Sequence, residues 1–270
     1  MQFKNIEVFN FNNAFRGMRN PLNSWDKSDS YYGIISLDQD HMIEQVVQTY
    51  PIDNDKDQNF KVYNDYLHWL NKNGILYQEE NSTNALVFYL GYNDLFLARR
   101  LIKAGSSDRK FLRQIFVSID ITAPLYFWKE FDTYKIGTVA NSTSTMHKLA
   151  STPITKDCFE MGDFNSDMML YENDPYNPDI YLSEFWEMLI NDLEHLRKEY
   201  NETKNQKYWK ELVRLLPSGW LQTRTVTLNY EILRNIYKQR KHHRLIEWHQ
   251  FCDWVKTLPY AYELILYNLD

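Results

Sequence analysis

The chain has 270 residues, of which 44% are apolar, 16% aromatic and 24% charged. These fractions are typical of a globular protein and exclude a disordered or collagen-like chain. No apolar run reaches the roughly 18 residues that a membrane span requires, and the first residues lack the apolar core of a signal peptide. The two cysteines, Cys158 and Cys252, are too few for a disulfide framework or a four-thiolate metal site. We therefore expect a cytoplasmic protein with no membrane partner.

The net charge is −6, from 30 basic and 36 acidic residues. Proteins that bind duplex nucleic acid usually carry a basic excess, because neutralisation of phosphates supplies much of their affinity. We therefore expect no duplex nucleic acid partner, although a local pocket can still hold a small anion. The length allows one large domain or two small ones over residues 1–270, and no clear linker divides the chain.

In chain order, residues 3–11 are apolar and aromatic and predict an opening strand. Apolar residues at helical spacing predict a helix over 57–71, and the polar stretch 71–84 predicts a loop. The same spacing predicts a second helix over 94–104. Gly105 follows it and is a natural end for that helix.

The next segment, 114–121, is rich in β-branched residues and predicts a strand. Thr122 and the proline two residues later predict a helix start with a hydroxyl N-cap. The helix is expected over 125–134. The stretch 138–145, rich in serine and threonine, predicts a loop.

The C-terminal half is mostly helical in pattern. A polar loop is expected over 171–179, and helices over 182–200 and 206–216. Alternating side chains predict a strand over 221–228, and residues 230–257 predict one long or broken helix. Helices dominate and strands are few, so the fold class is α/β or α+β.

One face of the last helical stretch combines apolar residues with an arginine. The residues on that face are Leu233, Ile236, Arg240, Glu247, Phe251 and Trp254. A core-facing stripe should be apolar, so Arg240 requires an explanation. It is either a structural ion pair or snorkelling side chain, or a guanidinium directed into a pocket for a carboxylate, a phosphate or a uracil-like carbonyl.

Other chemical motifs are weak. His243 and Glu247, four residues apart, could share a metal, but an ordinary helix pair is the commoner arrangement and the zinc-protease spacing is absent. We therefore expect no metal site. The hydroxyl cluster 141–145 either caps the next helix or binds a phosphate or base. Glycine-rich nucleotide motifs are absent, and neither cysteine has an activating neighbour.

Several residues of the C-terminal half resemble those of the flavin-dependent thymidylate synthases, the ThyX family. The residues that keep the family's order and nearly its spacing are Pro217, Thr223, Arg224, Thr227, Asn229, Asn235 and Arg240. The resemblance spans roughly residues 90–265. It implies a single ThyX-like domain, helix-rich with a central mixed or antiparallel sheet, in which 1–85 are divergent and 86–270 resemble the family.

The family's signature motif, RHRxxSxNExSxRY, falls on residues 133–147 and is eroded. Within the RHR triplet that opens the motif, Tyr134 stands at the position of the histidine and Lys135 at that of the last arginine. Thr138 and Ser144 stand for the two serines, the second after a one-residue insertion. Each charge-assisted hydrogen bond lost from a buried anion site costs about 1.5–3 kcal/mol.

The resemblance implies reductive methylation of dUMP, or of a related pyrimidine nucleotide. Methylene-tetrahydrofolate would give the carbon, NADPH would reduce FAD, and Arg240 would be the catalytic residue that polarises the pyrimidine. The implied flavin contacts are Tyr134, Lys135, Asn229 and Asn235, and the implied substrate contacts are Glu130, Thr138, Ser144 and Arg214. Family members form homotetramers, so a homotetramer is expected. The alternative is an inactive homologue that binds a nucleotide or a protein partner and has lost flavin chemistry.

Overall fold

The computed structural model describes residues 1–36, 84–172 and 174–269. The predicted helix over 57–71 lies outside the described residues, and so does the predicted loop over 71–84 except for its last residue, where β3 begins. Two compact units divide the chain. Unit 1 comprises residues 1–2, 121–133 and 141–224, and unit 2 comprises 3–120, 134–140 and 225–270. The single domain over 1–270 therefore stays a prediction.

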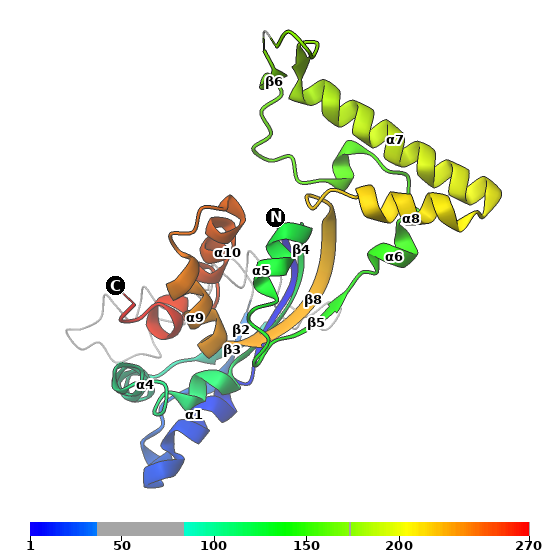
Figure 1. Cartoon of the computed structure of the whole chain (residues 1–270). Helices are drawn as coiled ribbons and strands as arrows, with labels where there is room; N and C mark the ends of the chain where they lie inside the picture. Colours follow the sequence, from blue (N-terminus) through cyan, green and yellow to red (C-terminus); the bar gives the residue numbers. More distant parts are fainter. Residues whose placement is uncertain (37–83, 173, 270) are drawn as a thin grey trace. The chain divides into compact units, whose positions relative to one another are not determined.

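Four strands pair in one sheet within the described part of the chain (Figure 1). Its strand order is β1 (Gln2–Phe9), β4 (Phe116–Pro124), β8 (Leu221–Asn229) and β5 (Val139–Ser142). Along β4 the residues Val117, Ile119 and Ile121 are buried and alternate with partly exposed ones, as the two-residue period of a strand requires. The strands predicted at 3–11, 114–121 and 221–228 are confirmed, and the helix-rich α/β (α+β) class with them.

Unit 2 contains an aromatic core. Its helices are α1 (Phe11–Arg19), α4 (Tyr92–Ala104), α9 (Tyr230–Arg240) and α10 (Ile246–Lys256), and β2 (Tyr31–Ser36) pairs antiparallel with β3 (Asn84–Tyr89). The ring of Phe11 stacks on Phe88 at 5.2 Å and meets Tyr230 edge-on at 5.8 Å. Helix α4 ends as expected at Gly105, whose φ of 127° favours glycine.

The C-terminal helical stretch is broken rather than continuous. Helix α9 ends at Arg240 and α10 begins at Ile246, so the broken form of the predicted 230–257 helix is confirmed. The buried side chain of Arg234 holds the end of the chain, because its Nη1 donates to the carbonyls of Ile265 and Tyr267, each at 2.7 Å. Burial, together with the nearby charge of Arg109, lowers the pKa of Arg234 to about 10.

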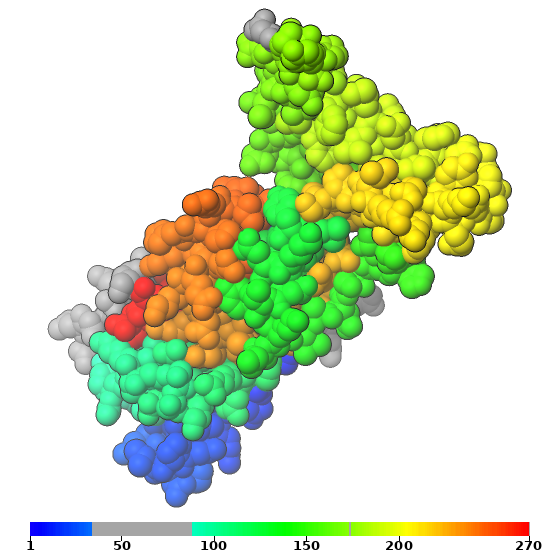
Figure 2. Space-filling view, in the orientation of Figure 1, coloured from blue at the N-terminus to red at the C-terminus, as the bar shows by residue number. Residues whose placement is uncertain are grey.

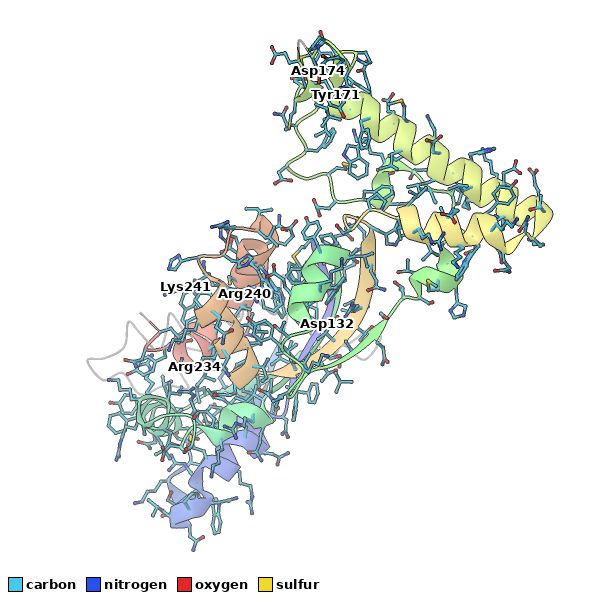
Figure 3. The ribbon with its side chains drawn as sticks, in the orientation of Figure 1. Asp132, Tyr171, Asp174, Arg234, Arg240 and Lys241 are labelled. Atoms are coloured by element: carbon cyan, nitrogen blue, oxygen red, sulfur yellow. The ribbon has the colours of Figure 1, made fainter. Side chains whose placement is uncertain are left out.

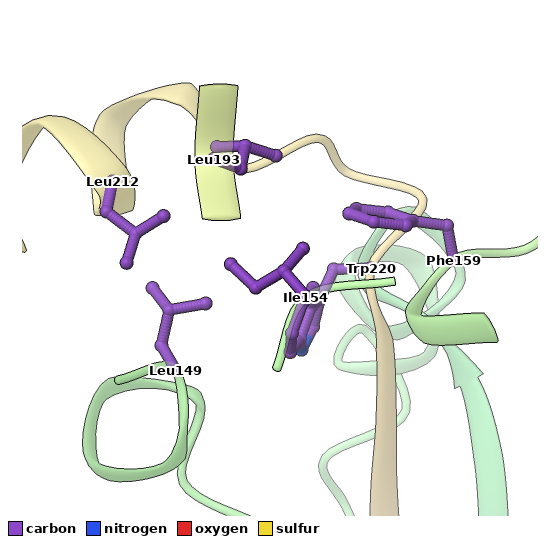
Figure 4. Packing of buried hydrophobic residues seen from close by; sticks show 6 residues of the cluster. All are labelled: Leu149, Ile154, Phe159, Leu193, Leu212 and Trp220. Atoms are coloured by element: carbon purple, nitrogen blue, oxygen red, sulfur yellow. The ribbon is translucent and has the colours of Figure 1, made fainter. Parts of the chain in front are cut away.

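Unit 1 has a separate core. Its elements are α5 (Leu125–Phe131), α6 (Thr145–Lys148), β6 (Met169–Tyr171), β7 (Ile180–Tyr181), α7 (Leu182–Thr203) and α8 (Gln206–Leu215). Figure 4 shows six buried residues that pack together there: Leu149, Ile154, Phe159, Leu193, Leu212 and Trp220. The predicted helices at 182–200 and 206–216 are confirmed. None of the described helices is long and apolar enough to span a bilayer.

Two local predictions were wrong. Thr122 does not cap a helix: β4 continues to Pro124, and the Thr122 hydroxyl bonds that of Thr223 at 2.7 Å. Cross-strand pairing thus outweighed the local helix-start signal. The predicted loop over 138–145 contains β5, because pairing along a sheet edge satisfies the backbone of a polar segment that has little strand propensity of its own.

Candidate functional site

Arg240 lies half-buried at the end of α9 (Figure 3). Its guanidinium contacts the side chains of two aromatic residues, Tyr134 and Trp248. Its Nε donates a hydrogen bond to the Tyr134 hydroxyl at 2.8 Å. Its Cζ lies 4.7 Å from the ring centre of Trp248 and 5.6 Å from that of Tyr134. Trp248 is fully buried. A guanidinium that is hydrogen-bonded to Tyr134 and lies over two aromatic rings is held in place, and a binding arginine requires such positioning.

The turn between α9 and α10 brings Trp248 beneath Arg240. His243 N–H donates to the carbonyl of Arg240 at 3.0 Å, and Leu245 N–H donates to His243 Nδ1 at 3.2 Å. That second bond makes Nδ1 an acceptor, which assigns the proton of a neutral ring to Nε2. The His243 ring meets Trp248 edge-on at 6.2 Å. We call Tyr134, Gln239, Arg240, His243 and Trp248 the Arg240 cluster; every member belongs to unit 2.

Residues 134–137 form a short segment that runs along α9. At one end, the Tyr134 hydroxyl donates to Gln239 Oε1 at 3.0 Å. At the other end, Gly137 has a φ of 78°, and a Cβ there would lie 3.4 Å from Ile232 and 3.5 Å from Asn229 Nδ2. Helical spacing places Asn235 on the face that also presents Ile232 and Gln239, three residues before it and four after it. The segment therefore covers the face of α9 that presents Asn235.

Three of the residues assigned to binding have unused polar groups. The Thr138 hydroxyl is buried and has no hydrogen-bond partner among the described residues. The side chains of Lys135 and Asn235 form no hydrogen bond or ion pair within the described part of the chain either. Buried polar groups are normally paired, so the Thr138 hydroxyl is a position where a ligand atom would satisfy the protein.

Asn229, by contrast, has a structural role. It is 7% exposed, and its Oδ1 accepts from the Ile232 N–H at 3.0 Å, which makes it the N-cap of α9. The Tyr134 hydroxyl is likewise used within the Arg240 cluster. Whether either residue also contacts a flavin stays a prediction.

Three of the assigned substrate residues belong to unit 1. Ser144 caps α6 by accepting from the His147 N–H at 3.2 Å, which favours the capping interpretation of the hydroxyl cluster. Arg214 is exposed on α8 and pairs with Glu211 one turn earlier. Glu130 is half-buried on α5, and its backbone carbonyl accepts from the Thr133 hydroxyl at 2.8 Å. The structure thus joins Tyr134 with Arg240 in unit 2 and places Glu130, Ser144 and Arg214 in the other unit.

Sequence pattern alone did not indicate two residues of the cluster, Trp248 and Gln239. In one continuous helix Trp248 would lie more than two turns from Arg240, and the break at 241–245 brings the two together. Gln239 lies among the basic residues 238–244 and has no other signal in the sequence. Glu247 is 2% exposed, and no cluster of three or more metal-ligating side chains occurs in the described ranges.

Comparisons with known proteins identify the fold. No family model matches the chain, and no curated protein matches it. Among solved structures, thymidylate synthase X (ThyX) from Helicobacter pylori with FAD and dUMP is 12% identical and covers 98% of this chain, which in turn covers 97% of it, with a TM-score of 0.54.

Two further structures match less well. Another complex of Helicobacter pylori ThyX with FAD and dUMP is 13% identical, with 77% of this chain and 91% of that chain covered and a TM-score of 0.46. The UMP/dUMP methylase PolB from Streptomyces cacaoi, bound with 5-Br UMP, is 11% identical, with 65% and 84% covered and a TM-score of 0.47. The first of these three matches shows that the chain has a ThyX-like fold.

Proposed function

We propose that the chain methylates a pyrimidine nucleotide of the dUMP type, with FAD as cofactor and with methylene-tetrahydrofolate and NADPH as co-substrates. The observation that carries the proposal is the guanidinium of Arg240, held between Tyr134 and Trp248 in a ThyX-like fold. The resemblance of the sequence predicted a pyrimidine-facing arginine at this position. We also propose that the protein is a cytoplasmic homotetramer, which sedimentation and cell fractionation would test.

Arg240 has the chemistry that a uracil ring requires. A guanidinium presents a planar fork of donors, which matches carbonyl oxygens of the ring. Negative charge that develops on the pyrimidine during methylation would be stabilised by a cation that is already oriented, so no reorganisation is needed at that moment. The Tyr134 hydroxyl and the Trp248 ring provide that orientation.

The residues with unused polar groups fit a flavin. Asn235 can both donate to and accept from a flavin ring, and Lys135 supplies a cation for a pyrophosphate. The buried Thr138 hydroxyl supplies a polar contact for the nucleotide substrate. A bound flavin would supply the hydride for the reduction. The loss of two positively charged triplet positions, now Thr133 and Tyr134, weakens anion binding, and it favours a nucleotide-binding protein without flavin chemistry as the second candidate.

Substitution of Arg240 tests the proposal. We expect visible flavin absorbance in the purified protein and a rise in melting temperature with dUMP. Arg240→Ala should abolish the rise with dUMP, and Arg240→Lys should restore little of it, because an ammonium lacks the planar fork. Rescue of a thymidine-requiring host should follow the same order.

Arg16→Ala is the matched control, because Arg16 also stacks on a tryptophan, Trp25, with 5.5 Å between Cζ and the ring centre. It should leave the response to dUMP unchanged. A dUMP response without flavin binding or rescue would favour the second candidate. Wild-type protein with neither a dUMP response nor a flavin would refute both candidates.

A further inference from the structure

The β6–β7 hairpin and the first turns of α7 expose seven large apolar side chains in unit 1. They are Met168, Leu170, Tyr171, Tyr176, Tyr181, Phe185 and Met188, each between 38% and 91% exposed. Figure 2 shows this part of the chain in light green, and Figure 3 labels Tyr171 beside Asp174. Single exposed apolar residues are ordinary, whereas a concentration of them in one short part of a unit is typical of an interaction site. We call these seven residues the hairpin–α7 surface.

Only part of the exposed apolar side of α7 lies outside its core-facing stripe. Leu193 is fully buried, and Leu189 and Leu196 pack with it in the unit 1 core. At about 100° per residue, Phe185 lies about 20° from Leu196 around the helix and borders that stripe, whereas Met188 lies about 80° from Leu196 and about 140° from Leu193. Met188, which is 49% exposed, therefore projects away from the unit 1 core.

Hydrogen bonds fix the backbone beneath the surface. Leu182 N–H donates to the carbonyl of Met168 at 2.7 Å, and the Ser183 hydroxyl donates to that of Ser166 at 3.1 Å. These bonds join the start of α7 to the hairpin. At the tip, the Asp174 carboxylate accepts from Tyr176 N–H at 2.8 Å. A surface that is already ordered loses little conformational entropy when a partner binds.

The charge around the surface has one sign. Residues 157–196 contain no lysine or arginine. The same stretch contains eleven acidic residues: Asp157, Glu160, Asp163, Asp167, Glu172, Asp174, Asp179, Glu184, Glu187, Asp192 and Glu194. On α7, Glu184 and Glu187 are exposed, and they directly precede Phe185 and Met188 in the sequence. The surface therefore combines apolar contact area with a strongly negative field.

We propose that the hairpin–α7 surface docks a protein partner through a segment that is both basic and apolar, such as an amphipathic helix rich in lysine or arginine. Charge complementarity selects that class of partner. Nucleic acid is disfavoured because its phosphates would face carboxylates. A second copy placed by a two-fold axis would bring the same acidic residues against each other, which also disfavours self-association here.

The test uses the full-length protein and two fluorescein-labelled peptides of equal length and charge. One peptide is an amphipathic helix of lysine and leucine, and in the other serine replaces leucine. We expect the leucine peptide to bind more tightly by fluorescence anisotropy, and its affinity to fall with added salt. Phe185→Ser with Met188→Ser should weaken its binding about tenfold. Glu184→Gln with Glu187→Gln should make the salt dependence shallower.

Leu22→Ser is the matched control, since Leu22 is 84% exposed in unit 2, and melting temperatures would verify that each variant folds. Glutamine at 184 retains the capping group of α7. The proposal is overturned if the two peptides bind equally, or if the apolar variant binds the leucine peptide as the wild type does. It is also overturned if that variant changes the sedimentation coefficient of the protein alone, because a second copy would then occupy the surface.

Discussion

Arg240 could be singled out from the sequence as a candidate site residue, whereas its contact with Tyr134 could not. The arginine on a mainly apolar stripe was visible in the sequence, because a charged residue on a buried face is rare without a partner. Its partner was not visible. Tyr134 lies 106 residues earlier in the chain, and the 2.8 Å bond between Arg240 Nε and its hydroxyl depends on tertiary packing that no local pattern encodes.

At the residue scale, the buried thiol of Cys252 should make the free energy of unfolding depend on pH. Burial raises the pKa of Cys252 from its ordinary value near 9 to about 11, while nearby Lys256 opposes the shift. The folded chain therefore keeps a proton that the unfolded chain loses, so the free energy of unfolding should fall as the pH rises from about 9 to about 11. Cys252→Ala should remove about 2 kcal/mol of this fall between about pH 8 and about pH 10.5.

Urea unfolding of both proteins across that range measures the difference. The slopes of unfolding free energy against pH are compared rather than the absolute stabilities, because the alanine also leaves a small cavity. Tyr237 and Lys256 also have raised pKa values, and both remain in the variant. Burial is the main cause of the raised pKa of Tyr237 and Cys252 only a smaller one, so most of their contribution cancels in the comparison. Identical slopes for the two proteins would contradict the prediction.

At the scale of elements, capping explains where several helices begin. Ser144, Asn205 and Asn229 each accept a backbone N–H in the first turn of the helix that follows. The sequence predicted most helices because their apolar spacing is regular, and it predicted the end of α4 from Gly105. It failed at Thr122 and over 138–145, since strand pairing with a distant segment decided both.

The cap of α9 allows the structural and flavin roles of Asn229 to be separated. Asn229→Ala should cost about 1 kcal/mol of unfolding free energy, because the Ile232 N–H loses its partner. Asn229→Asp should restore most of that stability. Asn205→Ala is the control, since Asn205 caps α8 in unit 1 by accepting from Lys207 N–H at 3.1 Å.

Urea denaturation measures the stabilities, and flavin absorbance after purification measures cofactor content. If Asn229 acts only as a cap, the aspartate variant should have normal flavin content. A stable aspartate variant without flavin would show that the amide itself contacts the cofactor. An alanine variant as stable as the wild type would contradict the capping role.

At the scale of the whole molecule, the two units have separate cores, and their independence is measurable. Leu193 is fully buried in the cluster shown in Figure 4, so Leu193→Ala should cost about 2–5 kcal/mol. We expect native-state hydrogen exchange to accelerate in α7 and α8 and to stay unchanged in α9 and α10. Equal acceleration in all four helices would instead support the single domain predicted from the sequence.

The distribution of charge along the chain also has a practical consequence. Trypsin has no cleavage site between Lys156 and Arg197, so the whole hairpin–α7 surface leaves a digest as one long peptide. Amine-directed cross-linkers find no lysine on that stretch, and a proteomic survey based on them would overlook any complex formed there. Cross-linking through carboxylates, followed by cleavage at methionine or aromatic residues, would detect complexes formed by this part of the protein.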